Sequence, residues 1–200
     1  MSILAYFTLF VKRENKPYFW YNLGVMIITY QGKTAFKISQ GSLGLSINPK
    51  AKTSADVTLF TGSAEETSDK SGFVITGPGE YEIKDIFIKG FLAKDGTGFK
   101  TTYLSTFEGM KLCFLGSLEA PEEIEDVDIL FVPVNSDPTK AYKLAVSLEP
   151  SVIIPMDYDE KSLEQFVKEG GEKAEPIDKL VVKKKDLEGK ESEIVVLKEE

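Results

Sequence analysis

The acidic stretch "TGSAEETSD", at residues 61–69, contains residues whose types and position make them candidates for a catalytic or metal-binding site. It directly follows the short apolar strand pattern at 57–60, and catalytic groups often lie on the loops that follow strands. Its carboxylates, Glu65, Glu66 and Asp69, are oxygen ligands of the kind that hard cations such as Mg²⁺, Mn²⁺ and Ca²⁺ prefer. No nucleophile and base stand together in it, so the stretch is open to three interpretations: an unusual site, a lost site or an ordinary loop.

The sequence contains no histidine. This absence excludes Ser-His-Asp and Cys-His activation of a nucleophile, and it excludes zinc sites built on imidazole. The single cysteine, Cys113, lies in the apolar run "KLCFLG", where we expect a buried small hydrophobic side chain rather than a reactive thiol. An enzyme made from these residues would depend on carboxylates, Lys, Tyr, Ser or Thr.

A metal-free acid–base site is one alternative. The segment "GPGEYE" offers Glu80 and Glu82 as bases, with Tyr81 or Tyr158 as proton donors. Glutamates that alternate along a strand are also the ordinary pattern of a solvent-facing side. The Gly-Pro-Gly sequence before them is typical of a turn.

The net charge of the chain limits the classes of partner that we expect. The 200 residues carry a formal net charge of −8, and the sequence pI is about 4.8. An acidic surface repels a phosphate backbone, so we expect no nucleic-acid partner. The sequence identifies no other partner and no ligand.

Residues 1–25 differ from the rest because they are rich in aromatic residues and include the only tryptophan, Trp20. Three interpretations are open: an extension outside the fold, an added strand or helix packed on the domain, or a membrane-surface anchor. The apolar run at 3–11 is too short to span a bilayer. We therefore expect no stable membrane insertion, a cytoplasmic protein, and a main domain over 26–200.

The remaining sequence predicts mostly strands. The patterns at 26–32 and 34–41 indicate a hairpin, and helical spacing with Asp at the start predicts helices over 137–150 and 159–171. Residues 178–200 are expected to form a second hairpin, with the run of three lysines at 183–185 as a solvated edge. Early strands followed by alternating strands and helices favour two sheets packed face to face with outer helices. One mixed sheet with helices on one side is the alternative.

Five segments carry a resemblance to a known family: "MIITYQGKTAFKIS", "GPGEYEIKDIFIKG", "MKLCFLGSL", "VDILFVPV" and "PSVIIPMDY". In this order and spacing they resemble the metallo-β-lactamase-fold superfamily, and in particular its Zn-dependent hydrolases of the ascorbate-6-phosphate lactonase-like kind. The resemblance covers about residues 26–200. It implies an α/β fold, an αββα sandwich of two mixed sheets with outer helices, and a site at one edge of the sheets. Relatives commonly self-associate, which implies a homo-oligomer.

The same resemblance locates the positions of the metal ligands. In that family the loop after the fourth strand reads T-H-x-H-x-D-H, and its histidines and aspartate hold zinc. Two further ligands, a bridging carboxylate and a last histidine, follow later strands. The corresponding positions here are Gly62, Ala64 and Thr67 for the first histidines, Glu66 for the aspartate, Ser117 for the bridging carboxylate and Asp157 for the last histidine.

The chain thus departs from the family at each ligand that the alignment traces. Gly62 and Ala64 have no donor atom, and the hydroxyls of Thr67 and Ser117 are poor zinc ligands. We interpret the chain as a degenerate hydrolase without zinc that acts in binding, assembly or regulation. The alternative is a hydrolase that uses Mg²⁺ or Mn²⁺, held by the carboxylates of the 61–69 stretch together with Asp157.

Overall fold

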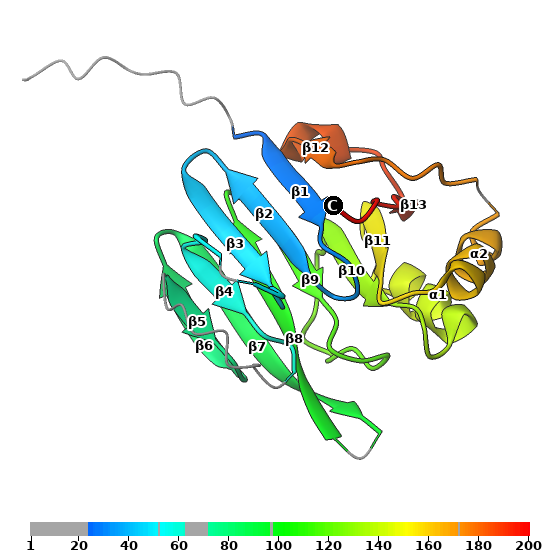
Figure 1. Ribbon diagram of the computed structural model, residues 1–200, viewed down its shortest axis with the longest axis horizontal. Helices are drawn as coiled ribbons and strands as arrows, with labels where there is room; N and C mark the ends of the chain where they lie inside the picture. The colour runs from blue at the N-terminus through cyan, green and yellow to red at the C-terminus, as the bar shows by residue number, and fades with distance from the viewer. Residues whose placement is uncertain (1–23, 52, 63–71, 97, 172) are drawn as a thin grey trace, which may run out of the picture.

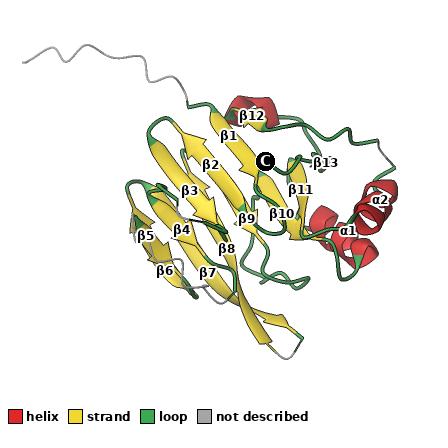
Figure 2. Cartoon of the chain, viewed as in Figure 1, coloured by secondary structure: helices red, strands yellow, loops and turns green. Residues whose placement is uncertain are grey.

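The computed structural model describes residues 24–51, 53–62, 72–96, 98–171 and 173–200. Within these ranges the chain forms two mixed β-sheets packed face to face, with two α-helices outside the second sheet (Figures 1 and 2). The prediction of an αββα sandwich is confirmed, and the alternative of one mixed sheet is wrong.

The first sheet has six strands in the order β12-β1-β2-β3-β4-β5. The predicted hairpin is confirmed, since β1 and β2 pair antiparallel with Ile28 opposite Ile38. Strand β4 pairs parallel with β3 on one side and with β5 on the other. The strands are β1 (Met26–Tyr30), β2 (Phe36–Gln40), β3 (Leu43–Ile47), β4 (Val57–Leu59), β5 (Phe73–Ile75) and β12 (Leu180–Val182).

The second sheet has seven strands in the order β13-β11-β10-β9-β8-β7-β6. Its half from β6 to β9 is antiparallel, and its half from β9 to β13 is parallel. The chain enters this sheet through the predicted turn at Gly77-Pro78, between β5 and β6. The strands are β6 (Gly79–Ile83), β7 (Ile86–Asp95), β8 (Gly98–Phe107), β9 (Met110–Phe114), β10 (Ile129–Pro133), β11 (Val152–Met156) and β13 (Glu193–Ile194).

Two helices form where the sequence predicts them, α1 (Pro138–Ser147) and α2 (Glu160–Glu169). Each begins at an aspartate whose side chain accepts a backbone N–H of the first turn: Asp137 caps α1, and Asp159 forms a capping box with Ser162. The helices follow β10 and β11, and their apolar faces pack on the outer face of the second sheet. This outer cluster includes Ala141, Ala145, Phe166, Leu130, Val132 and Ile153.

The main core fills the space between the sheets. Side chains alternate along β2, so that Phe36 and Ile38 point inward while Lys37 is exposed. The Phe36 ring meets Phe131 of the other sheet edge-on, with the ring centroids 4.8 Å apart, and Phe131 stacks on Phe114 at 4.3 Å. Because such pairs stabilise beyond their buried area, this trio fixes how the two sheets sit on each other.

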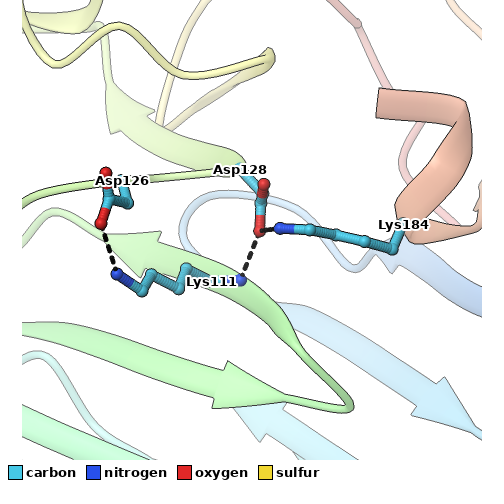
Figure 3. A network of polar contacts seen from close by, with 4 residues as sticks. All are labelled: Lys111, Asp126, Asp128 and Lys184. Atoms are coloured by element: carbon cyan, nitrogen blue, oxygen red, sulfur yellow. Dashed lines mark hydrogen bonds and ion pairs between the residues drawn. The ribbon is translucent and has the colours of Figure 1, made fainter. Parts of the chain in front are cut away.

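The C-terminal segment, residues 178–200, differs from the predicted hairpin. Instead of a hairpin, β12 pairs with β1 in the first sheet and β13 pairs with β11 in the second. The short 3₁₀ helix η1 (Lys184–Leu187) lies between them. Lys184 does not belong to a simple solvated edge, because its ammonium pairs with Asp128, whose carboxylate also accepts the backbone N–H of Lys111 (Figure 3). The segment therefore links the two sheets.

Among the residues that the structure describes, no helix is both long and apolar enough to cross a lipid bilayer. The first strand begins at Met26. The extension predicted at 1–25 falls almost wholly outside the described residues, so its boundary and its role stay predictions.

Candidate functional site

A cavity of about 380 Å³ opens where the two sheets meet at one edge, and we call it the edge pocket. Its walls come from the β1–β2 turn, the residues after β3, the end of β4 and one residue of β8. They are Gly32, Lys33, Thr34, Ala35, Asn48, Pro49, Lys50, Phe60, Thr61, Gly62 and Lys100. A larger hollow of about 580 Å³ lies along α2, but all its lining residues belong to that one helix, so it gathers no groups from different elements.

Asn48 holds the two strand ends of the pocket together. Its side-chain oxygen accepts the backbone N–H of Thr61 at 2.8 Å, and its amide nitrogen donates to the Thr61 hydroxyl at 2.9 Å. The same nitrogen donates to the Thr34 hydroxyl at 3.1 Å. Asn48 adopts a left-handed backbone conformation, with φ of 43°, which asparagine tolerates better than most residues.

Two bonds tie this end of β4 to the opposite sheet. The backbone N–H of Thr101, on β8, donates to the Thr61 carbonyl at 2.7 Å. The hydroxyl of Tyr103, a fully buried residue, donates to the Phe60 carbonyl at 3.0 Å. Burial raises the pKa of Tyr103 to about 12, because the phenolate would lose its water. The floor of the pocket is therefore fixed by both sheets.

The β1–β2 turn forms the opposite wall. Gly32 has φ of 84°, a left-handed backbone conformation that favours glycine, and a Cβ there would displace the flexible ends of the Glu199 and Lys50 side chains. The Lys33 carbonyl accepts two donors, the Tyr30 hydroxyl at 2.9 Å and the Asp157 backbone N–H at 2.6 Å. Burial, the largest cause, raises the pKa of Tyr30, which keeps this hydroxyl a donor.

Among the described residues, lysines supply the charged side chains of the pocket wall. Lys33, Lys50 and Lys100 line it, and no acidic residue of the described chain does. Lys50 pairs at 3.0 Å with Glu199, which lies beside the pocket, and both side chains are more than half exposed, at 52% and 59%. No carboxylate of the described ranges pairs with Lys33.

Three of the six positions that the resemblance singles out are described. Gly62 lines the edge pocket. Ser117 is buried, and in the described part of the chain its hydroxyl has no hydrogen-bond partner. It follows Gly116, which packs against the Thr101 backbone. Asp157 binds Lys33 through its backbone N–H and is not among the lining residues.

Gly62 thus lines the edge pocket, while Ser117 and Asp157 lie next to residues that border it. Ala64, Glu66 and Thr67 lie outside the described residues, as do Glu65 and Asp69 of the acidic stretch. Convergence of all six positions on one pocket therefore stays a prediction.

The donor groups of the described residues do not fit zinc. Gly62 has no donor atom, Ser117 offers a neutral hydroxyl, and lysines line the pocket. In the described ranges no three His, Cys, Asp or Glu side chains come together as they would around a metal ion. Tetrahedral zinc sites need thiolate, imidazole or carboxylate ligands.

Three of the four residues of the metal-free acid–base alternative have structural partners. Glu80, on β6, pairs with Lys89 of β7 at 3.1 Å and is largely exposed. The Tyr81 hydroxyl donates to the Pro78 carbonyl, and the Tyr158 hydroxyl donates to the Leu197 carbonyl. Neither glutamate and neither tyrosine lines the edge pocket.

Asn48 and the three pocket lysines were missed by the sequence interpretation. No motif surrounds any of the three lysines, and Lys33 and Lys100 are far apart along the chain. The one available signal was the Gly-Lys pair at 32–33, which indicated a turn but not a wall of a pocket.

The two packed mixed sheets and the pocket at their edge define a sandwich of the metallo-β-lactamase type. Residues 27–157, more than half of the chain, match the family described as "Beta-lactamase superfamily domain". The chain belongs to this superfamily.

Solved structures agree with this assignment. A candidate Zn-dependent hydrolase of the metallo-beta-lactamase superfamily from Thermotoga maritima is 26% identical, with a TM-score of 0.70 over 86% of this chain and 98% of that chain. A candidate metal-dependent hydrolase from Parabacteroides distasonis is 15% identical, with a TM-score of 0.63 over 86% of this chain and 93% of that chain.

Igni18, a metallo hydrolase from the archaeon Ignicoccus hospitalis, is 16% identical, with a TM-score of 0.59 over 86% of this chain and 94% of that chain. At 15% and 16% identity, the last two structures show the fold alone. A search of curated proteins found no match.

Proposed function

We propose that this protein is a member of the superfamily without metal-dependent hydrolase activity, and that its edge pocket serves binding, assembly or regulation. The observation that carries the proposal is the chemistry of the wall: three lysines line it, and within the described ranges no carboxylate, imidazole or thiol does. The absence of histidine from the whole sequence supports the same conclusion.

The physical argument concerns charge. A metallohydrolase uses a divalent cation to lower the pKa of a bound water and to polarise the bond that is cut. The lysines of the described wall offer such a cation no ligand, because a protonated amine has no lone pair to give. Nothing else on the described wall could activate water near neutral pH, since Asn48, Thr34 and Thr61 are neutral and bond to one another.

The alternative, a hydrolase with a hard divalent cation, requires the carboxylates of Glu65, Glu66 and Asp69 together with Asp157. Asp157 does not line the edge pocket. The alternative therefore requires the carboxylates of the acidic stretch to lie close to Asp157, outside the edge pocket.

Metal content tests the proposal. The purified chain is loaded separately with Zn²⁺, Mn²⁺ and Mg²⁺, dialysed, and analysed by mass spectrometry of the elements. We expect less than about 0.1 equivalent of each metal. A stoichiometric metal that is lost in the double variant E66Q/D157N would overturn the proposal in favour of the hard-cation alternative.

We also propose a cytoplasmic location. The only cysteine of the chain, Cys113, is a free and fully buried thiol. A protein without disulfides suits a reducing compartment. Fractionation of cells that express the full chain tests this, and recovery in a secreted fraction would contradict it.

A further inference from the structure

We propose that residues 1–23 of the chain dock on the outer face of strands β6, β7 and β8. This surface is remote from the edge pocket, so the proposal does not depend on whether a metal binds there. Helices α1 and α2 lie on the side of β10 and β11 (Figure 1). In the described ranges no helix covers the half of the second sheet that β6, β7 and β8 form.

The strand register shows which side chains share this face, because cross-strand partners point to the same side of a sheet. One row of partners consists of Glu82, Phe87, Thr106 and Lys111. The next row consists of Glu80, Lys89, Leu104 and Cys113. Cys113 is buried in the cluster on which the helices pack, so both rows belong to the outer face. We call the part of this face on β6, β7 and β8 the outer β6–β8 face.

Apolar side chains form a stripe across the outer β6–β8 face. Phe87 and Phe91 lie on the same side of β7, and Leu104 is opposite Lys89, between them. Phe91 and Leu104 are half-buried against the cluster under the helices, whereas Phe87 is 50% exposed. Because burial of such a side chain is favourable, a segment that covered Phe87 would be stabilised there.

Acidic residues border the stripe on the β6 side. Glu80 and Glu82 are both exposed. Glu80 pairs with Lys89 at 3.1 Å, but no cation of the described ranges pairs with Glu82.

The connection between β9 and β10 supplies acidic residues on the other side of the stripe. Its Ile124 packs in the cluster of the outer face, and Asp126 pairs with Lys111 of the first row at 3.1 Å (Figure 3). Its exposed acidic residues are Glu119, Glu122, Glu123, Glu125 and Asp126. The surface is therefore an apolar stripe between two acidic borders, and it fits a segment that is both apolar and cationic.

Residues 1–23 have this chemistry. They contain the apolar run "ILAYFTLFV", and after it the cations Lys12, Arg13 and Lys16 against the single acidic residue Glu14. Trp20 follows in a second aromatic group. This excess of positive charge contrasts with the net charge of −8 of the whole chain.

The point where the segment joins the fold is connected to this face. The Gln40 amide nitrogen donates to the Gly24 carbonyl at 2.9 Å, which holds the chain at the start of β1. Strand β1 pairs there with β12. Just after β12, Lys184 bonds the Asp128 carboxylate, which also accepts the Lys111 backbone N–H (Figure 3). Because 23 residues span up to about 75 Å when extended, the segment is long enough to reach Phe87.

Val181 of β12 is the rival apolar surface beside the start of β1. It is 51% exposed and lies opposite Ile27. The lysines around it in sequence are Lys179, Lys183 and Lys185. They repel a cationic segment, so the charges favour the outer β6–β8 face.

Trp20 is the only tryptophan of the chain, so its fluorescence reports on the segment alone. The test measures the emission of Trp20 and its quenching by acrylamide in the full chain, with the urea-unfolded chain as the fully exposed limit. In wild type we expect blue-shifted emission and protection from acrylamide. F87S should lower the ratio of docked to free segment about tenfold, because about half of the apolar contact of a phenylalanine is lost. E82Q should lower the same ratio about twofold.

The matched control is V181S, which removes a side chain that is as exposed as Phe87 and should leave Trp20 protected. Circular dichroism confirms that each variant is folded, and because Glu82 is exposed, E82Q tests the surface even if F87S does not fold.

Three results would overturn the proposal: Trp20 as exposed in wild type as in urea, quenching unchanged in F87S and E82Q, or equal release in V181S. Protection that grows with protein concentration, together with a dimer in light scattering, would also overturn it, because the segment would then dock on a second copy.

Discussion

Asn48 binds Thr61 through both ends of its side-chain amide, as acceptor of the Thr61 N–H at 2.8 Å and as donor to the Thr61 hydroxyl at 2.9 Å. This relationship joins the end of β3 to the end of β4, at the point where the superfamily places its metal-binding loop. The strand end that leads into the loop aligned with the family's ligands is therefore held by both ends of one side chain.

The first prediction concerns this link. N48A should lower the free energy of unfolding by about 2–4 kcal/mol, because three hydrogen bonds are lost and alanine tolerates a positive φ poorly. N48G loses the same bonds without the backbone strain, so it should be about 1 kcal/mol more stable than N48A. Urea denaturation measures both values, and a wild-type midpoint in N48A would show that the link has no structural role.

The second prediction concerns Tyr103. Y103F should reduce stability at pH 7 by about 1–2 kcal/mol, because the buried Phe60 carbonyl loses its donor. The folded pKa of Tyr103 is raised to about 12, above its unfolded value near 10. Its protonated form thus stabilises the fold fully below pH 10, and that stabilisation is lost as the pH rises toward 12. Denaturation curves from pH 8 to 11.5 should show the advantage of wild type over Y103F shrinking above pH 10, and a constant gap would refute the assignment.

The third prediction concerns Asp56, whose carboxylate accepts from Lys84 of the β6–β7 turn and from the Gly44 backbone N–H. The bond from Lys84 is the main cause that lowers the pKa of Asp56. A lowered pKa stabilises the fold above the unfolded value near 4, and the contribution is lost as the pH falls below it. D56N should therefore cost about 1.5 kcal/mol at pH 7 and progressively less below pH 4.

The matched control for Asp56 is D178N. Asp178 pairs with Lys198, but its side chain is 84% exposed, so its removal should change stability by less than about 0.5 kcal/mol. Equal losses in D56N and D178N at pH 7 would contradict a special role for the Asp56–Lys84 contact.

The parts of the fold that the sequence predicted are those with local signals. The hairpin of β1 and β2 has its turn residues between two apolar runs, and both helices have an aspartate cap and helical spacing. The C-terminal segment was wrong because its partners are remote: Met26 for Val182 and Ile153 for Ile194. No local pattern reveals that two neighbouring strands enter different sheets.

From the sequence, the site could be predicted only as a set of positions at which the family's metal ligands are substituted. The resemblance located Gly62, Ser117 and Asp157, because the scaffold segments around them remain recognisable. It could not locate the lysines of the pocket, since Lys33 and Lys100 line one cavity only after the two sheets have packed together. The composition of the pocket wall is a property of the packed sandwich, whereas the substitutions at the aligned ligand positions can be read along the chain.

The central claim is that substitution of the ligands, rather than a change of scaffold, removed the metal site. Zinc titration by calorimetry of the wild-type chain beside a variant with the family's ligands restored (G62H, A64H, E66D, T67H, S117D and D157H) tests it most directly, with circular dichroism to confirm that both are folded. We predict less than about 0.1 equivalent of zinc in wild type and about one or two equivalents in the variant. Stoichiometric zinc bound by the wild-type chain would contradict the account.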